Sequence, residues 1–127
     1  MTRLLLVGMG GFVGSVLRYG LSGVAQDLAR SSLFPWGTLA VNLLGCLAIG
    51  VVAQLAESRG AFSAETRLLV ATGLLGGFTT FSAFGNETLL LLRDAERALA
   101  LANVLANVIL GLACAQLGRV AAHLVWR

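Results

Sequence analysis

The chain has 127 residues, of which 57% are hydrophobic and only 12% are charged, and its mean hydropathy is +0.87. Soluble globular proteins carry about 25% charged residues, so this composition excludes an ordinary soluble domain and favours a protein that lies in the lipid bilayer. It also excludes an intrinsically disordered chain, which combines low hydrophobicity with high charge. The net charge of +3 comes from arginines scattered between apolar runs, whereas a nucleic-acid-binding protein would gather them on one face, so no nucleic-acid partner is expected.

Four apolar runs are each long enough to cross the hydrocarbon core of a bilayer, which takes about 20 helical residues. We therefore expect an all-α integral membrane protein, a single four-helix transmembrane domain over residues 1–127. The expected spans lie at about residues 4–26, 37–56, 67–92 and 98–124. The three connections between them are too short to hold another domain. Trp36 and Trp126 fall at span ends, as interfacial aromatic residues do.

The arginines are divided almost evenly between the two sides of the membrane. In a four-span chain both termini share one side with the connection between the second and third spans. That side has five arginines and the other has four: Arg3, Arg59, Arg67, Arg119 and Arg127 against Arg18, Arg30, Arg93 and Arg97. Orientation normally follows an excess of positive charge on the cytoplasmic side. The balance leaves two alternatives, which are insertion in both orientations and a single orientation set by the arginines nearest the spans.

Glycines in the first span suggest close helix packing. Gly8 and Gly10 resemble the start of a dinucleotide-binding loop, but that motif requires glycine at position 13, which is Val13. Gly10 and Gly14 instead have the four-residue spacing that lets transmembrane helices approach closely. A pair with the same spacing lies at residues 73 and 77 of the third span.

The middle of the third span contains Gly76-Gly77-Phe78-Thr79-Thr80, which weakens a helix where water cannot replace its hydrogen bonds. We predict that the third helix is broken at its centre. Free backbone groups at the membrane midplane are tolerated only if they are buried or line an ion site. Carbonyl oxygens there would bind cations, and N–H groups would favour anions. The alternative is a glycine pair that only admits a neighbouring helix.

Polar and aromatic side chains recur inside the predicted spans. Any one amide or hydroxyl is explained by a hydrogen bond between helices. Taken together, and without a buried cationic cluster, they suit a pathway for a small anion, because amides and hydroxyls donate hydrogen bonds and phenyl edges carry partial positive charge. The set comprises Thr38, Asn42, Thr79, Phe81, Ser82, Phe84, Asn86, Asn103 and Asn107.

Arg18 and Glu87 are the only charged residues inside the runs, and intramembrane charges are functional candidates by default. Arg18 either concentrates anions in an aqueous vestibule or extends to the membrane surface. Glu87 is either structural, paired or protonated. Cys46, Cys114 and His123 form no metal-binding or catalytic spacing, and no enzymatic activity is expected.

Three segments together resemble the CrcB/Fluc family of fluoride channels, and the resemblance extends over nearly the whole chain. The segments are GGFVGSVLRY at residues 10–19, GTLAVNLLG at residues 37–45 and TGLLGGFTTFSAF at residues 72–84, with Glu87 following the third. The resemblance implies an antiparallel, dual-topology homodimer in the plasma (inner) membrane of a bacterium. Two pores would let fluoride leave the cytoplasm passively and so relieve fluoride toxicity.

The same resemblance implies roles for particular residues. A structural sodium ion at the dimer centre would be held by the backbone carbonyls of Gly76 and Thr79 from both subunits. Asn42 would donate a hydrogen bond to the ion, and Arg18 would face the cytoplasmic-type vestibule. The remaining pore residues would be Phe81 and Phe84 with their ring edges, Thr80, Ser82 and Asn107, with Glu87 as a candidate functional carboxylate. Ala83 and Gly85 depart from the family pattern, in which Thr and Ser are common.

Two other classes of function compete with a channel. A proton-coupled four-helix transporter, similar to the small multidrug resistance proteins, would have to use Glu87, because the carboxylate that such carriers hold in the first helix is absent and only Arg18 is charged there. A structural or assembly protein would transport nothing.

Overall fold

The computed structural model describes residues 1–30 and 33–126, apart from the side chain of Arg59. The first two long helices are α1 (Thr2–Ala29) and α2 (Trp36–Arg59). The third consists of α3 (Ala64–Arg67), the π-helical η1 (Leu68–Leu75), α4 (Gly76–Phe78) and α5 (Phe81–Arg93). The fourth consists of α6 (Arg97–Leu105), the π-helical η2 (Ala106–Leu110) and α7 (Gly111–Val125).

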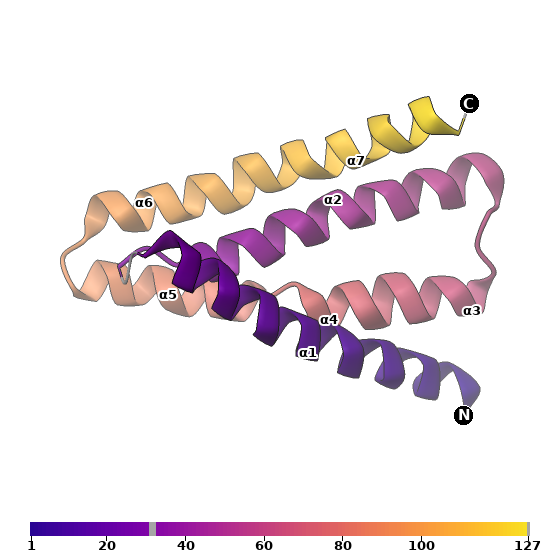
Figure 1. Cartoon of the computed structure of the whole chain (residues 1–127), viewed down its shortest axis with the longest axis horizontal. Helices are drawn as coiled ribbons and strands as arrows, with labels where there is room; N and C mark the ends of the chain where they lie inside the picture. The colour runs from indigo at the N-terminus through magenta and orange to yellow at the C-terminus, as the bar shows by residue number, and fades with distance from the viewer. Residues whose placement is uncertain (31–32, 127) are drawn as a thin grey trace.

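Four helical stretches in the described part of the chain are long and apolar enough to cross a membrane: Thr2–Ala29, Trp36–Ser58, Ala64–Arg93 and Arg97–Val125. The prediction of an all-α protein with four such helices is therefore confirmed. Both ends of the described chain lie at the same end of the bundle as the connection between α2 and α3 (Figure 1). The connections from α1 to α2 and from α5 to α6 lie at the opposite end (Figure 1). Arg127, one of the arginines counted above, lies outside the described residues.

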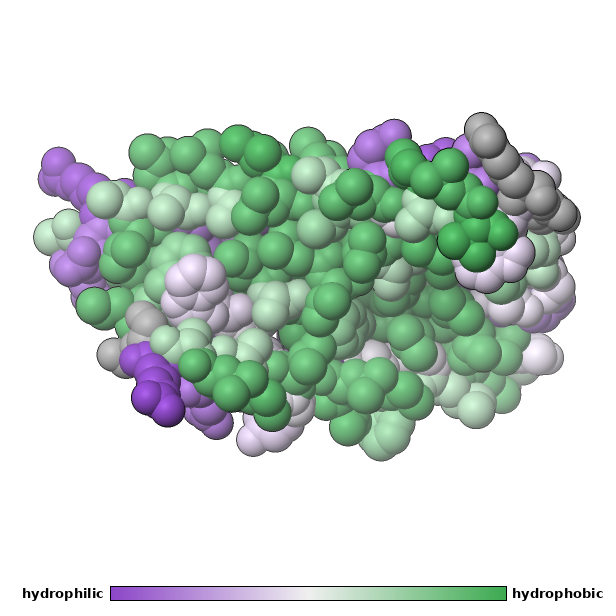
Figure 2. All heavy atoms as spheres, turned by 45° about the horizontal axis from the view of Figure 1, so that its top comes forward, coloured by the Kyte–Doolittle hydropathy of each residue, from purple (hydrophilic) through white to green (hydrophobic). Residues whose placement is uncertain are grey.

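The outer surface of the bundle is apolar along most of its length. Figure 2 shows hydrophobic residues across the middle of the visible face and most of the strongly hydrophilic ones toward its ends. Large side chains that a soluble protein would bury are open here, among them Leu4 at 75%, Phe12 at 72% and Leu112 at 70% exposure. Helices that are apolar on their outer faces are typical of a bilayer environment. The chain is thus a multi-pass membrane protein.

Close contacts at glycines hold α1 against the third helix. A Cβ atom added at Gly10 would lie 2.8 Å from Leu74 N, and one added at Gly77 would lie 2.6 Å from Gly11 O. Real Cβ atoms do not approach backbone so closely, so only glycine allows this packing. Gly50 and Gly118 have the same role where α2 crosses α7. The predicted close approach at the glycines of the first and third spans is confirmed.

Candidate functional site

The third helix changes conformation at Thr79 and Thr80, which have extended backbone between α4 and α5 (φ −86°, ψ 159° and φ −148°, ψ 111°). Gly76 itself is helical, with φ −63° and ψ −38°, so the extended residues lie just after the glycine pair and not at it. Thr79 ends the first half by donating from its N–H and its hydroxyl to Leu75 O, both at 3.1 Å. Thr80 begins the second half, because its hydroxyl accepts a hydrogen bond from Ala83 N at 3.2 Å.

Asn42 of α2 supplies the hydrogen bonds that the helix lacks at this point. Thr80 N donates to Asn42 Oδ1 at 2.9 Å, and Asn42 Nδ2 donates to Thr80 O at 3.2 Å. In a continuous α-helix the N–H of Thr80 would bond Gly76 O, and the N–H of Ala83 would bond Thr79 O. Both N–H groups are directed at side-chain oxygens instead. The carbonyls of Gly76 and Thr79 therefore do not have their usual helical donors.

Three asparagine amides continue this network into the fourth helix. Asn42 Nδ2 also donates to Asn107 Oδ1 at 2.9 Å, and Asn107 Nδ2 donates to Asn103 Oδ1 at 2.9 Å and to Asn103 O at 3.0 Å. Asn103 is completely buried, and Asn107 lies in η2. Single π-helical turns are frequent at functional sites.

The first cavity at this network, the Phe cavity, has a volume of about 380 Å³. The rings of Phe81 and Phe84 lie 5.4 Å apart between centroids and are tilted by 57°. Phe84 is buried at 9% exposure, whereas Phe81 is 83% exposed. Polar amide and hydroxyl residues thus meet the two phenyl rings at one cavity. Its lining includes Asn42, Cys46, Gly76, Thr79, Thr80, Phe81, Phe84 and Asn107.

The second cavity, the Arg18 cavity, has a volume of about 320 Å³ and is lined in part by Arg18, Thr38, Thr80 and Glu87. Thr38 Oγ1 donates to Glu87 Oε1 at 2.6 Å. Arg18 Nε and Glu87 Oε2 are buried and have no hydrogen-bond partner among the described residues. A donor and an acceptor are thus both available at this cavity. Thr80 lines the Phe cavity as well, so both cavities adjoin the interruption of the third helix.

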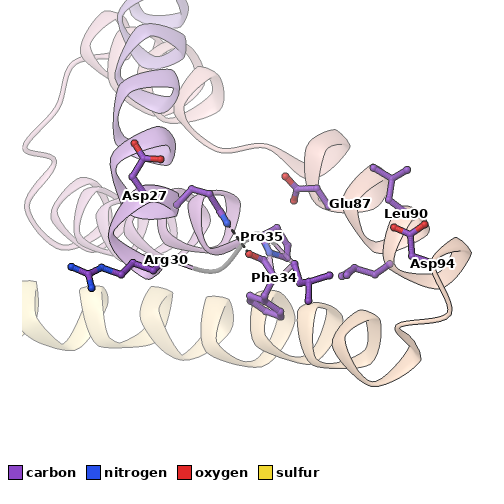
Figure 3. Close-up of a pocket in the computed structure, with 10 residues that line it drawn as sticks. Asp27, Arg30, Phe34, Pro35, Glu87, Leu90 and Asp94 are labelled. Carbon is purple, nitrogen blue, oxygen red and sulfur yellow. Dashed lines mark hydrogen bonds between the residues drawn. The ribbon is translucent and has the colours of Figure 1, made fainter.

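A third cavity, the outer cavity of about 800 Å³, lies between the connection from α1 to α2 and the end of α5. Figure 3 shows around this space Glu87 on α5 and Asp94 just after its end, with Asp27 on α1 and Arg30 just after the end of that helix. Gln26 fixes the connection, because its Nε2 donates to Phe34 O at 3.1 Å and its Oε1 accepts from Gly37 N at 3.0 Å. Glu87 lines both the outer cavity and the Arg18 cavity. It lies between the space at this end of the bundle and the interior.

The structure brings most of the predicted site residues together. Asn42, Thr80, Phe81, Phe84 and Asn107 line the Phe cavity together with Gly76 and Thr79, and Arg18 and Glu87 line the Arg18 cavity. Ser82 is exposed; its Oγ lies 3.4 Å from Thr80 Oγ1, and it lines none of the three cavities.

Sequence reasoning missed one contributor to this network. Thr38 and Asn103 were included among the polar residues of the spans without a role of their own, but Thr88 was not recognised at all. Thr88 lies one turn after Phe84 and accepts a hydrogen bond from Asn103 Nδ2 at 3.0 Å. Its spacing from Phe84 was the available signal.

Residues 5–119 match the family described as CrcB-like protein, Camphor Resistance (CrcB). The chain is similar to the protein named fluoride-specific ion channel FluC of Methylobacillus flagellatus, with 45% identity over 93% of this chain and 92% of the relative. It is also similar to the FluC protein of Thermus thermophilus, with 48% identity over 93% of each chain, and to FluC 1 of Methanosarcina acetivorans, with 43% identity over 96% of this chain and 92% of the relative. Because the match covers most of the chain and the relatives align over nearly their full length, this chain belongs to the CrcB family.

Proposed function

We propose that this chain is a passive, fluoride-selective ion channel that lets fluoride leave the cytoplasm across the plasma (inner) membrane of a bacterium and so relieves fluoride toxicity. The observation that carries the proposal is the Phe cavity, where two phenyl rings and two amides meet at the interruption of the third helix. The names of the relatives as fluoride-specific ion channels support the choice of ion.

The proposed route joins the Arg18 cavity to the Phe cavity across Thr80, which lines both. Arg18 attracts the anion, and its Nε donor, which has no hydrogen-bond partner in the described part of the chain, contacts it first. Phenyl edges and the amide and hydroxyl groups then replace the hydration shell, as a selectivity filter must do.

Passage also requires that the ion leave. Both donor positions of Asn42 Nδ2 are already used, by Thr80 O and by Asn107 Oδ1. A hydrogen bond from Asn42 to fluoride therefore replaces an existing one and adds little net binding free energy. A site that binds weakly enough to release its ion is what conduction needs.

We further propose that the working unit is an antiparallel homodimer in which a second copy, inserted with opposite topology, covers the exposed Phe81. The nearly balanced arginines favour such double insertion. The carbonyls of Gly76 and Thr79 fit a structural sodium ion at the dimer centre, because their helical donors are engaged elsewhere and both residues line the Phe cavity. Bound sodium would offset the partial negative charge of these carbonyl oxygens at the proposed midplane break. Cross-linking in vesicles tests the dimer.

The decisive experiment is fluoride efflux from proteoliposomes, followed with a fluoride electrode, with chloride release measured in parallel. We expect rapid fluoride release and little chloride release. Equal release of the two anions would contradict the selectivity, and release of neither would favour a structural or assembly protein.

The second candidate function is proton-coupled transport. It is favoured by one observation, the buried Glu87 Oε2 without a partner among the described residues, on a side chain that lies between two cavities. The Glu87 variant discussed below separates the two functions.

A further inference from the structure

A chain of hydrogen bonds begins on the third helix at the Phe cavity, passes through α2 and the fourth helix, and returns to the third helix. Each group donates to the next; the first donor is the backbone N–H of Thr80, and the last acceptor is the backbone carbonyl of Phe84, four positions later. In order, it passes through Thr80, Asn42, Asn107, Asn103, Thr88 and Phe84. The two ends flank Phe81.

The last two hydrogen bonds of this chain are made by Asn103 and Thr88, which lie outside the Phe cavity. Asn103 Nδ2 donates to Thr88 Oγ1 at 3.0 Å, and Thr88 Oγ1 donates to Phe84 O at 2.8 Å. Asn103 is completely buried, so water cannot replace these partners. Neither Asn103 nor Thr88 lines any of the three cavities.

Both ends of the chain determine which way the amides point. The N–H of Thr80 can only donate, so Asn42 must present its oxygen there. The carbonyl of Phe84 can only accept, so the Thr88 hydroxyl donates to it and has its oxygen left to accept from Asn103 Nδ2. Reversing any one amide alone would set donor against donor on one side of it and acceptor against acceptor on the other.

We propose that Thr88 and Asn103 are positioning residues for ion passage: the Thr88 hydroxyl holds the Asn103 amide with its oxygen toward Asn107, and this places Asn107 against Asn42 at the Phe cavity. The inference rests on the proposed function and adds to it two residues that the ion does not touch. Loss of the Thr88 hydroxyl leaves the buried Asn103 Nδ2 without its acceptor, so the Asn103 amide is no longer held with its oxygen toward Asn107. Asn42 keeps its two bonds to Thr80, whereas Asn107 keeps only its bond to the backbone carbonyl of Asn103 and shifts relative to Asn42.

The test compares two substitutions of the half-buried Thr88. Thr88→Val keeps the shape of the side chain and removes the hydroxyl, and Thr88→Ser removes the methyl group and keeps the hydroxyl. In each protein the side-chain amide signals of Asn42 and Asn107 are recorded by ¹⁵N NMR, and fluoride and chloride efflux are measured from proteoliposomes. Thr88→Ala, which lacks both groups, serves as the second variant without a hydroxyl.

We expect Thr88→Val to shift or double the amide signals of Asn42 and Asn107 and to lower fluoride efflux about tenfold, the effect of one net hydrogen bond. Thr88→Ala should do the same, and Thr88→Ser should keep the wild-type signals and efflux. A structural role alone would lower the yield of folded protein without changing these signals in the folded fraction.

Wild-type amide signals and efflux in both Thr88→Val and Thr88→Ala would overturn the inference. It would also fail if Thr88→Ser were as impaired as Thr88→Val, because the hydroxyl would then not be the cause. Absence of fluoride release from wild-type vesicles would instead refute the proposed function, and a role in passage with it. The wild-type measurement therefore distinguishes the two failures.

Discussion

Asn42 and Thr80 bond each other in both directions, side-chain oxygen to backbone N–H at 2.9 Å and side-chain nitrogen to backbone carbonyl at 3.2 Å. Apolar surroundings offer no water to satisfy a broken helix, and an unpaired backbone group is costly there. One side chain of α2 thus satisfies both backbone groups of Thr80 at the point where the third helix is extended. The same side chain reaches the proposed ion path, so stability and function are linked at Asn42.

Asn42→Ala should therefore impair both properties. Removal of the amide leaves the N–H of buried Thr80 unpaired, at a cost of about 1–3 kcal/mol. We expect a lower Tm in detergent and a large loss of fluoride efflux. Leu44→Ala, on the same helix but exposed, is the matched control and should change both little. An unchanged Tm in Asn42→Ala would show that the Thr80 backbone finds another partner.

Phe81→Ile and Phe84→Ile should each sharply reduce fluoride efflux. Isoleucine keeps an apolar side chain but has no ring edge to offer the anion. The measurement is the initial rate of fluoride release from proteoliposomes containing equal amounts of protein. Cys114→Ala, which alters none of the lining of the Phe cavity, should leave the rate nearly unchanged. Wild-type rates in both phenylalanine variants would remove the rings from the mechanism.

Glu87→Gln separates a channel from a proton-coupled transporter. Glutamine keeps the size of the side chain and an oxygen that can accept the hydrogen bond from Thr38, but it cannot carry a proton between the two cavities. For a channel we expect passive fluoride efflux to persist without a pH gradient. The check is fluoride release with and without an imposed gradient. Abolished transport in the variant, together with gradient-driven transport in the wild type, would favour the coupled transporter.

Gly14→Ala should destabilise the protein. A Cβ atom at Gly14 would lie 2.9 Å from Phe78 N, so α1 would have to move away from the third helix. Overpacking of this kind costs about 1–3 kcal/mol. Gly20→Ala is the control on the same helix, where an added Cβ meets no atom within 4 Å. Thermal unfolding in detergent measures both, and equal Tm values would contradict the close packing of α1.

Removal of sodium should lower the thermal stability of the protein if the carbonyls of Gly76 and Thr79 hold that ion. We expect a lower Tm and slower fluoride efflux when sodium is replaced by a large organic cation on both sides of the membrane. Potassium serves as the control for ionic strength. The same Tm in all three solutions would argue against a structural sodium ion.

The four-helix architecture could be predicted from sequence because it depends on a local property, the length of apolar runs in a bilayer that accepts only structures with satisfied backbone. The close packing at Gly10 and Gly14 was predictable for a similar reason, since a four-residue repeat places both glycines on one helix face. The candidate residues of the third span could be named from their motif.

Tertiary structure decided how those residues are connected. The sequence suggested that the helix is lost at Gly76 and Gly77, but the extended residues are Thr79 and Thr80. The side chain that satisfies the backbone of Thr80 is Asn42, which lies 38 positions away. The contribution of Thr88 likewise depends on Asn103 of another helix. Hydrophobic length is a property of each segment alone, whereas the direction of a hydrogen bond depends on which donors and acceptors the packed helices bring within reach.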